Sequence, residues 1–243
     1  MSGAAAALGA ALVIGSIAIG TYLWLPARRA DDHRANLGAA LIGGAVIALA
    51  IFLIQIVVDE RRQEDSEQQN LRLTLGLSRS LVGIDLSGAD LEAMYLASKD
   101  LSRAQLVDAN LRRAHLAGAT LTGADLSGAT LDCANLSLAR AGDATFIESS
   151  LANASLVGFE GQDAKFFGAD LRGADLSRAR FPDATFLGAN LTGADLSEAD
   201  LRTADLTDAT LTDVRHDATT VWPPGHRAPR STPTAGPREE RCR

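Results

Sequence analysis

The chain has 243 residues, and 23 lysines and arginines against 30 aspartates and glutamates give it a net charge of −7 at pH 7. This acidic balance argues against direct binding of nucleic acid, which depends on clustered basic side chains. The two cysteines are too few for the disulfide framework that holds small secreted domains together.

Two uncharged stretches stand near the start of the chain, at residues 4–25 and 37–58. Each would be about 33 Å long as a helix, which is enough to cross the hydrocarbon core of a bilayer. The short polar segment 26–36 would join them. We therefore expect a two-helix transmembrane hairpin over residues 1–58. A cleaved signal peptide and a pair of helices buried in a globular domain are the alternatives.

Two short segments follow the second stretch. Residues 59–70 (DERRQEDSEQQN) are densely charged and lack Gly and Pro, so we expect them to continue the helix as a juxtamembrane linker. Residues 71–77 (LRLTLGL) alternate apolar and polar side chains, which predicts a strand. Such a strand would cap the next domain, whose first coil would otherwise expose unpaired backbone groups.

A five-residue repeat occupies the middle of the chain. From Leu86 to Leu211 every fifth residue is large and apolar except Ala141 and Gly161, and leucine takes 20 of these 26 central positions. Alanine fills 21 of the 26 positions that lie two residues earlier. A period of five fits neither a helix nor a plain strand. It fits a chain that turns a corner every five residues.

The repeated unit, as in Ala89-Asp90-Leu91, has the pattern A-(D/N)-L-x-x and strongly resembles the pentapeptide-repeat family. The resemblance implies an all-β solenoid, a right-handed quadrilateral β-helix, which we expect over residues 71–221 with clear repeats at 84–213. Four sides of five residues would close a coil of 20, so residues 20 apart should stack on neighbouring coils. Phe146, Phe166 and Phe186 have this spacing.

The central residues should fill the inside of the coils. Phe159 and the other rings would occupy space left by the small residues Ala141 and Gly161, as dense packing requires. The predicted core includes Leu86, Leu91, Leu111, Leu126, Leu136, Phe146, Phe166, Leu176, Phe186, Leu196 and Leu206.

Charged residues of alternating sign recur every 20 residues on the outside. Arg140, Glu160, Arg180 and Asp200 form the predicted charge ladder, and Arg178 and Glu198 form a second pair of the same kind. Opposite charges on adjacent strands contribute about 0.2–1 kcal/mol each.

The end of the chain differs in composition. Residues 222–243 contain five prolines and five arginines, and we expect this segment to be disordered because it cannot build a core. Cys133 takes an outward position in the repeats and Cys242 lies in the tail. We expect no disulfide between them, because it would join a rigid wall to a flexible end.

The sequence carries no recognisable catalytic chemistry. Its histidines, His33, His115, His216 and His226, are scattered, and no His or Cys pair has metal-ligand spacing. The recurring glycines are turn residues rather than a phosphate-binding loop. We therefore expect no catalytic site, no metal and no cofactor, and a protein that is not an enzyme.

These features predict an integral membrane protein of a bacterial plasma membrane. Arginines are nearly balanced on the two sides of the hairpin, so the positive-inside rule leaves its orientation open. The resemblance implies a cytoplasmic repeat domain, because pentapeptide-repeat proteins are mostly cytoplasmic.

We expect a membrane-tethered scaffold that presents a rigid acidic surface to an unidentified protein partner, since solenoids offer long surfaces rather than pockets. Residues 71–221 hold 21 acidic against 13 basic side chains, a net charge of −8. Beyond the membrane and that protein, a second copy of the chain is a further partner left open. The alternative function is inhibition of a nucleic-acid enzyme by DNA mimicry, since some pentapeptide-repeat proteins resemble DNA in shape and charge and bind DNA gyrase.

Overall fold

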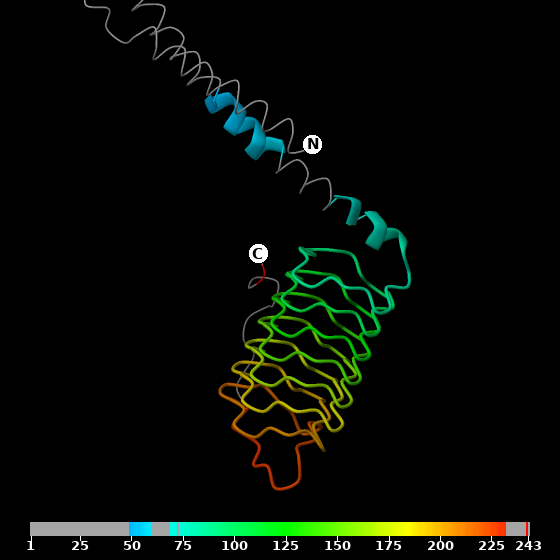
Figure 1. The fold of residues 1–243 in the computed structure, drawn as a ribbon. Helices are drawn as coiled ribbons and strands as arrows, with labels where there is room; N and C mark the ends of the chain where they lie inside the picture. Colours follow the sequence, from blue (N-terminus) through cyan, green and yellow to red (C-terminus); the bar gives the residue numbers. More distant parts are fainter. Residues whose placement is uncertain (1–48, 60–68, 72, 232–241, 243) are drawn as a thin grey trace, which may run out of the picture. The chain divides into compact units, whose positions relative to one another are not determined.

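A computed structural model describes residues 49–59, 69–71, 73–231 and 242 of the chain. The chain divides into two compact units, Met1–Gln69 and Asn70–Arg243, and each is described by itself. Helices run over residues 49–59 and 69–77, with residue 72 outside the described part. The rest of the second unit is a stack of coils (Figure 1).

The first unit supplies a correction to the predicted localisation. The predicted stretch 4–25 and residues 37–48 of the second stretch lie outside the described residues, while residues 49–59 form a helix. No helix in the described part is long and apolar enough to cross a membrane. This finding contradicts the prediction of an integral membrane protein.

The second unit is a four-sided solenoid, as expected. Parallel β-bridges join residues 20 apart on adjacent coils, from Ser80↔Asp100 to Asp195↔Arg215, and a last bridge joins Asp200 to Val221. Every fifth residue from Ser80 to Asp200 takes part. Four sides of five residues therefore make one coil.

Each side uses its five residues in the same way, as the side that begins at Asp85 illustrates. Asp85 holds the bridge position, Leu86 the central position, Ser87 and Gly88 the first and second outward positions, and Ala89 the alanine position. The Ala89 N–H donates to the Leu86 carbonyl at 3.1 Å and closes a tight turn. The Leu86 and Gly88 N–H groups donate to the next coil at 2.7 and 2.8 Å, so the backbone is paired along the stack.

The second outward position has a positive φ along the solenoid except at Thr203, and 16 of the residues with this conformation are not glycine. A positive φ strains most L-residues but is tolerated by Asn and Asp. The side chains kept at these positions therefore carry a conformational cost that glycine would avoid.

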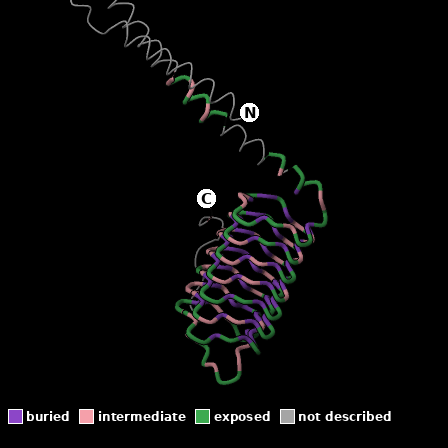
Figure 2. Tube along the Cα trace, viewed as in Figure 1, coloured by how far each residue is buried: buried purple, intermediate pink, exposed green. Residues whose placement is uncertain are grey.

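Central and alanine positions point inward and form one continuous core, and buried residues recur at regular intervals along every coil (Figure 2). Phe146, Phe166 and Phe186 stack face to face with centroids 4.7 and 4.8 Å apart. Gly161 lies against Phe159 and Phe181: a Cβ on Gly161 would sit 2.9 Å from one ring and 3.0 Å from the other. Rings thus fill the space that this small central residue leaves.

A helix, not the predicted strand, covers the first coil. Leu71 and Leu75 lie four residues apart on one side of helix 69–77; Leu75 is fully buried and Leu71 packs against the core. Leu73 and Leu77 point outward and are exposed. Lys99, which replaces the usual alanine, is buried, and its Nζ donates to the carbonyls of Gly76 at 3.1 Å and Ser78 at 2.6 Å.

The last coil is closed by polar and aromatic contacts. Asp217 Oδ1 accepts from the Glu198 N–H at 3.2 Å, and Thr220 Oγ1 donates to the Leu196 carbonyl at 2.9 Å. The described part of the tail, residues 222–231, continues from this turn. Trp222 packs against the core and lies between the rings of His216 and His226, at centroid distances of 5.4 and 5.2 Å.

Candidate functional site

The interior of the solenoid is filled. All eleven side chains predicted for the core are at most 8% exposed, and they belong to one continuous hydrophobic core. Any binding by this unit therefore takes place on its outer walls or at its ends.

The described residues hold no group of three or more His, Cys, Asp or Glu that could bind a metal ion. His115 lies on a wall beside Tyr95, with ring centroids 6.1 Å apart, whereas His216 and His226 lie at the far end. His33 is outside the described residues. His216 and His226 thus share one aromatic cluster around Trp222, whereas His115 lies on a wall beside Tyr95.

The aspartates at bridge positions have a structural role in the turns. Asp100 accepts from the Ser102 hydroxyl at 2.6 Å and from its N–H at 3.1 Å. The hydroxyl bond is the main reason why the pKa of Asp100 is lowered, followed by the amide bond. At Asp170, burial raises the pKa, but hydrogen bonds and charge from Arg172 outweigh it and lower the pKa. These carboxylates are held ionised by their own turns.

The predicted charge ladder occupies one column of the solenoid. Bridges join Arg140 to Glu160, Glu160 to Arg180 and Arg180 to Asp200. No ion pair links two of these four side chains, all of which are described. Arg140 donates to Thr120 Oγ1 at 3.1 Å. Asp200 lies 3.6 Å from Arg202.

The first three residues of this column line an open hollow of about 380 Å³. Arg140, Glu160 and Arg180 form one border, and the side chain missing at Gly142 leaves space between Thr122 and Gln162. The second predicted pair does form: Arg178 Nε lies 3.1 Å from Glu198 Oε2. Both partners are about half exposed or more, so the pair contributes little to stability.

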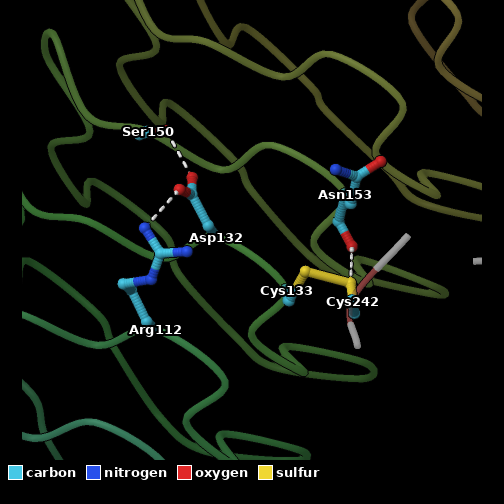
Figure 3. Close-up of a disulfide and its surroundings, with 6 residues drawn as sticks. All are labelled: Arg112, Asp132, Cys133, Ser150, Asn153 and Cys242. Atoms are coloured by element: carbon cyan, nitrogen blue, oxygen red, sulfur yellow. Dashed lines mark hydrogen bonds and ion pairs between the residues drawn. A yellow bond between two sulfur atoms is a disulfide. The ribbon is translucent and has the colours of Figure 1, made fainter. Parts of the chain in front are cut away.

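The two cysteines form a disulfide, which corrects the expectation that they stay apart. Their Cα atoms are 5.7 Å apart across a sequence separation of 109 residues (Figure 3). Cys133 is at a second outward position, with φ of 60°, so its thiol faces away from the core. The entropic cost of closing a loop rises only slowly with its length, so the segment around Cys242 can bind to this wall although it is distant in sequence.

A column of outward apolar residues was not among the features predicted from the sequence. Of the 27 first outward positions from 82 to 212, only 147, 167 and 187 hold Ile, Phe or Leu. They lie on three successive coils of one side. Phe167 is 44% exposed, and Ile147 and Leu187 are half-buried. Their 20-residue spacing was the signal that could have revealed them.

Known proteins share this architecture. The family model described as pentapeptide repeats matches residues 84–116, 109–146, 144–183, 162–197 and 186–215, in eight copies, and the fold of such repeats is a right-handed β-helix. No curated protein matches the chain.

Solved structures of several pentapeptide repeat proteins are similar to part of the chain. One, from the thylakoid lumen of Arabidopsis thaliana, is 30% identical over 44% of this chain and 71% of its own, with a TM-score of 0.35. HetL from the cyanobacterium Nostoc, involved in regulating heterocyst differentiation, is 31% identical over 56% and 81%, with a TM-score of 0.22. QnrB1, a plasmid-mediated fluoroquinolone resistance protein, is 18% identical over 58% and 91%, with a TM-score of 0.32.

Proposed function

Since the chain belongs to the pentapeptide-repeat family, we propose that it is a non-catalytic binding protein whose outer walls dock a protein partner. The observation that carries the proposal is the sealed interior, in which central and alanine positions form one continuous buried core. Backbone groups are paired from coil to coil, so the walls are rigid. A rigid wall loses little conformational entropy when it binds.

Charge supports a partner with a basic surface. Residues 71–221 carry 21 acidic against 13 basic side chains, and the described ion pairs, such as Arg112–Asp132 and Arg215–Asp195, leave acidic groups in excess. A wall of one sign speeds encounter with a partner of the opposite sign and disfavours acidic competitors.

The proposal is tested by placing a photo-crosslinking amino acid at one bridge position on each side: Glu160, Lys165, Asn190 or Asp175. Each full-length variant is irradiated in cells that express it, and adducts are identified by mass spectrometry. We expect a discrete protein adduct from one side and none from the opposite one. Absence of protein adducts from all four sides, or co-purification of a small-molecule product with the chain, would contradict a docking role.

A second candidate is mimicry of DNA, favoured by the acidic excess on a straight rod of stacked coils. The purified chain would then inhibit DNA supercoiling by gyrase at micromolar concentration. An unchanged supercoiling rate at that concentration would remove this candidate and leave the docking role untouched.

A further inference from the structure

The apolar column Ile147, Phe167 and Leu187 has a rigid support. Directly before each residue lies one ring of the buried phenylalanine stack, whose interplanar angles are only 4° and 2°. The ring centroids in this stack are 4.7 and 4.8 Å apart, which matches the usual spacing of adjacent strands. Glycines 168 and 188 follow Phe167 and Leu187, and a Cβ at Gly188 would meet nothing within 4 Å. The column is therefore open beside Leu187, whereas the Glu148 side chain lies beside Gly168, with its Cγ 3.6 Å from where a Cβ of Gly168 would sit.

The corner between this side and the preceding one carries acid. Asp143, Asp163 and Asp183 occupy the second outward position on the same three coils, are exposed, and have φ of 58°, 55° and 57°. None of them joins an ion pair within the described part of the chain, and Asp163 accepts only from Gln162 Nε2, at 3.1 Å. We call residues 143–148, 163–168 and 183–188 the acid–apolar face. It presents three carboxylates along one edge and three apolar side chains along the other.

The spacing of this face fits a helix better than a strand. Adjacent strands lie about 4.8 Å apart, in line with the ring distances of 4.7 and 4.8 Å, and this step is close to the rise of about 5.4 Å per helical turn, so three turns can match three coils. Residues on one face of a strand are about 6.7 Å apart, so they no longer match the coil spacing after one coil. The Lys165 and Phe166 N–H groups already donate to Ala144 and Thr185, which leaves no free strand edge for β-addition.

We propose that the acid–apolar face binds an amphipathic helix of a partner protein, parallel to the solenoid axis. Apolar residues on three successive turns of that helix cover Ile147, Phe167 and Leu187. Arginines or lysines beside them meet Asp143, Asp163 and Asp183, none of which joins an ion pair in the described structure. This inference rests on the proposed docking function and names its site and the class of its partner.

The test measures binding of a synthetic helix to the full-length chain by fluorescence anisotropy. The probe is a peptide of about 15 residues with leucines on three successive turns and arginines beside them; a second peptide carries glutamates in place of the arginines. Phe167→Ser should weaken binding of the basic peptide at least about tenfold. The matched control is Leu138→Ser, which removes an apolar side chain that is 68% exposed on another side and should leave the affinity unchanged. Both variants alter exposed residues, and equal melting temperatures verify folding.

A triple variant, Asp143→Asn, Asp163→Asn and Asp183→Asn, tests the charge. Asn tolerates a positive φ, so the fold persists, while the salt dependence of binding should flatten. Failure of the basic peptide to bind, equal binding of the acidic peptide, or insensitivity to Phe167→Ser would overturn the proposal. So would a dimer of the chain that Phe167→Ser dissociates, because the occupant would then be a second copy. A cellular protein adduct from Asn190 or Asp175, with none from Lys165, would overturn this face and leave the docking function standing.

Discussion

At the scale of single residues, packing in the solenoid depends on pairs of deviations from the repeat. Gly161 replaces a central leucine and Phe159 replaces an alanine two residues earlier. The Phe159 ring, 5.9 Å from that of Phe181, takes the volume that Gly161 leaves. Each deviation would be harmful alone, and together they keep the core filled.

We predict that Gly161→Leu, which restores the family pattern, destabilises the protein by about 1–3 kcal/mol because the new side chain meets two rings. Phe159→Ala alone should cost about 3–5 kcal/mol by leaving a cavity. The double variant should be more stable than the sum of the two changes implies, as urea unfolding of all four proteins would reveal. Additive effects would contradict the packing described for this pair.

The carboxylate of Asp217 predicts a pH dependence at the C-terminal turn. Hydrogen bonds, first that from the Thr219 hydroxyl, lower its pKa from 3.8 to about 2. A lowered pKa in the folded state means that the carboxylate stabilises the fold above about pH 4 and that this contribution is lost as the pH falls through about 2.

Urea midpoints of the wild type and Asp217→Asn, measured from neutral pH to about pH 2, test this dependence. The wild type should be more stable at neutral pH, and the difference should shrink between about pH 4 and pH 2. Other aspartates with lowered pKa, such as Asp85 and Asp205, titrate in both proteins and cancel in the comparison. A difference that stays constant with pH would contradict the assignment.

At the scale of elements, a pattern that recurs many times along the chain predicts structure more fully than one that occurs once. The five-residue period recurs 26 times, so the sides, the turns and the 20-residue coil could all be predicted. The cap had only residues 71–77. There, Leu71, Leu73, Leu75 and Leu77 satisfy the alternation of a strand, while Leu71 with Leu75 also satisfies a helix. Burial of Leu75 against the first coil decides for the helix, and that contact has no local signal.

Contacts between elements that are distant in sequence could not be predicted from the sequence either. Lys99 stands where alanine is expected, and only the folded cap shows that its ammonium group bonds to the Gly76 and Ser78 carbonyls. The apolar column could have been found, since the spacing of 147, 167 and 187 uses the same 20-residue step as the phenylalanine stack. The residues of the charge ladder do lie in one column, as predicted, but they form no ion pairs with one another. Side-chain rotamers rather than coil register decide those contacts.

At the scale of the whole molecule, the disulfide between Cys133 and Cys242 links the end of the chain to the wall across 109 residues. A cross-link of this span restricts the unfolded chain and stabilises the fold by up to about 4–5 kcal/mol in the chain-entropy model. We predict that dithiothreitol lowers the urea midpoint of the wild type. The control variant, Cys133→Ser with Cys242→Ser, should be insensitive to the reductant. Equal midpoints with and without reductant would contradict the link.

The surfaces proposed for binding all depend on one claim, that residues 20 apart lie side by side on one wall. Paired cysteines test it most directly, introduced into the variant that lacks Cys133 and Cys242. The pair Thr185→Cys and Asp205→Cys occupies bridged positions on adjacent coils, within the Cα separation of about 4.4–6.8 Å that a disulfide needs. Pairing Thr185→Cys instead with Asp200→Cys or with Thr210→Cys places the second cysteine on a neighbouring side. Mass spectrometry after mild oxidation should find a disulfide in the first variant and free thiols in the other two; equal cross-linking of all three pairs would contradict the four-sided coil and every surface derived from it.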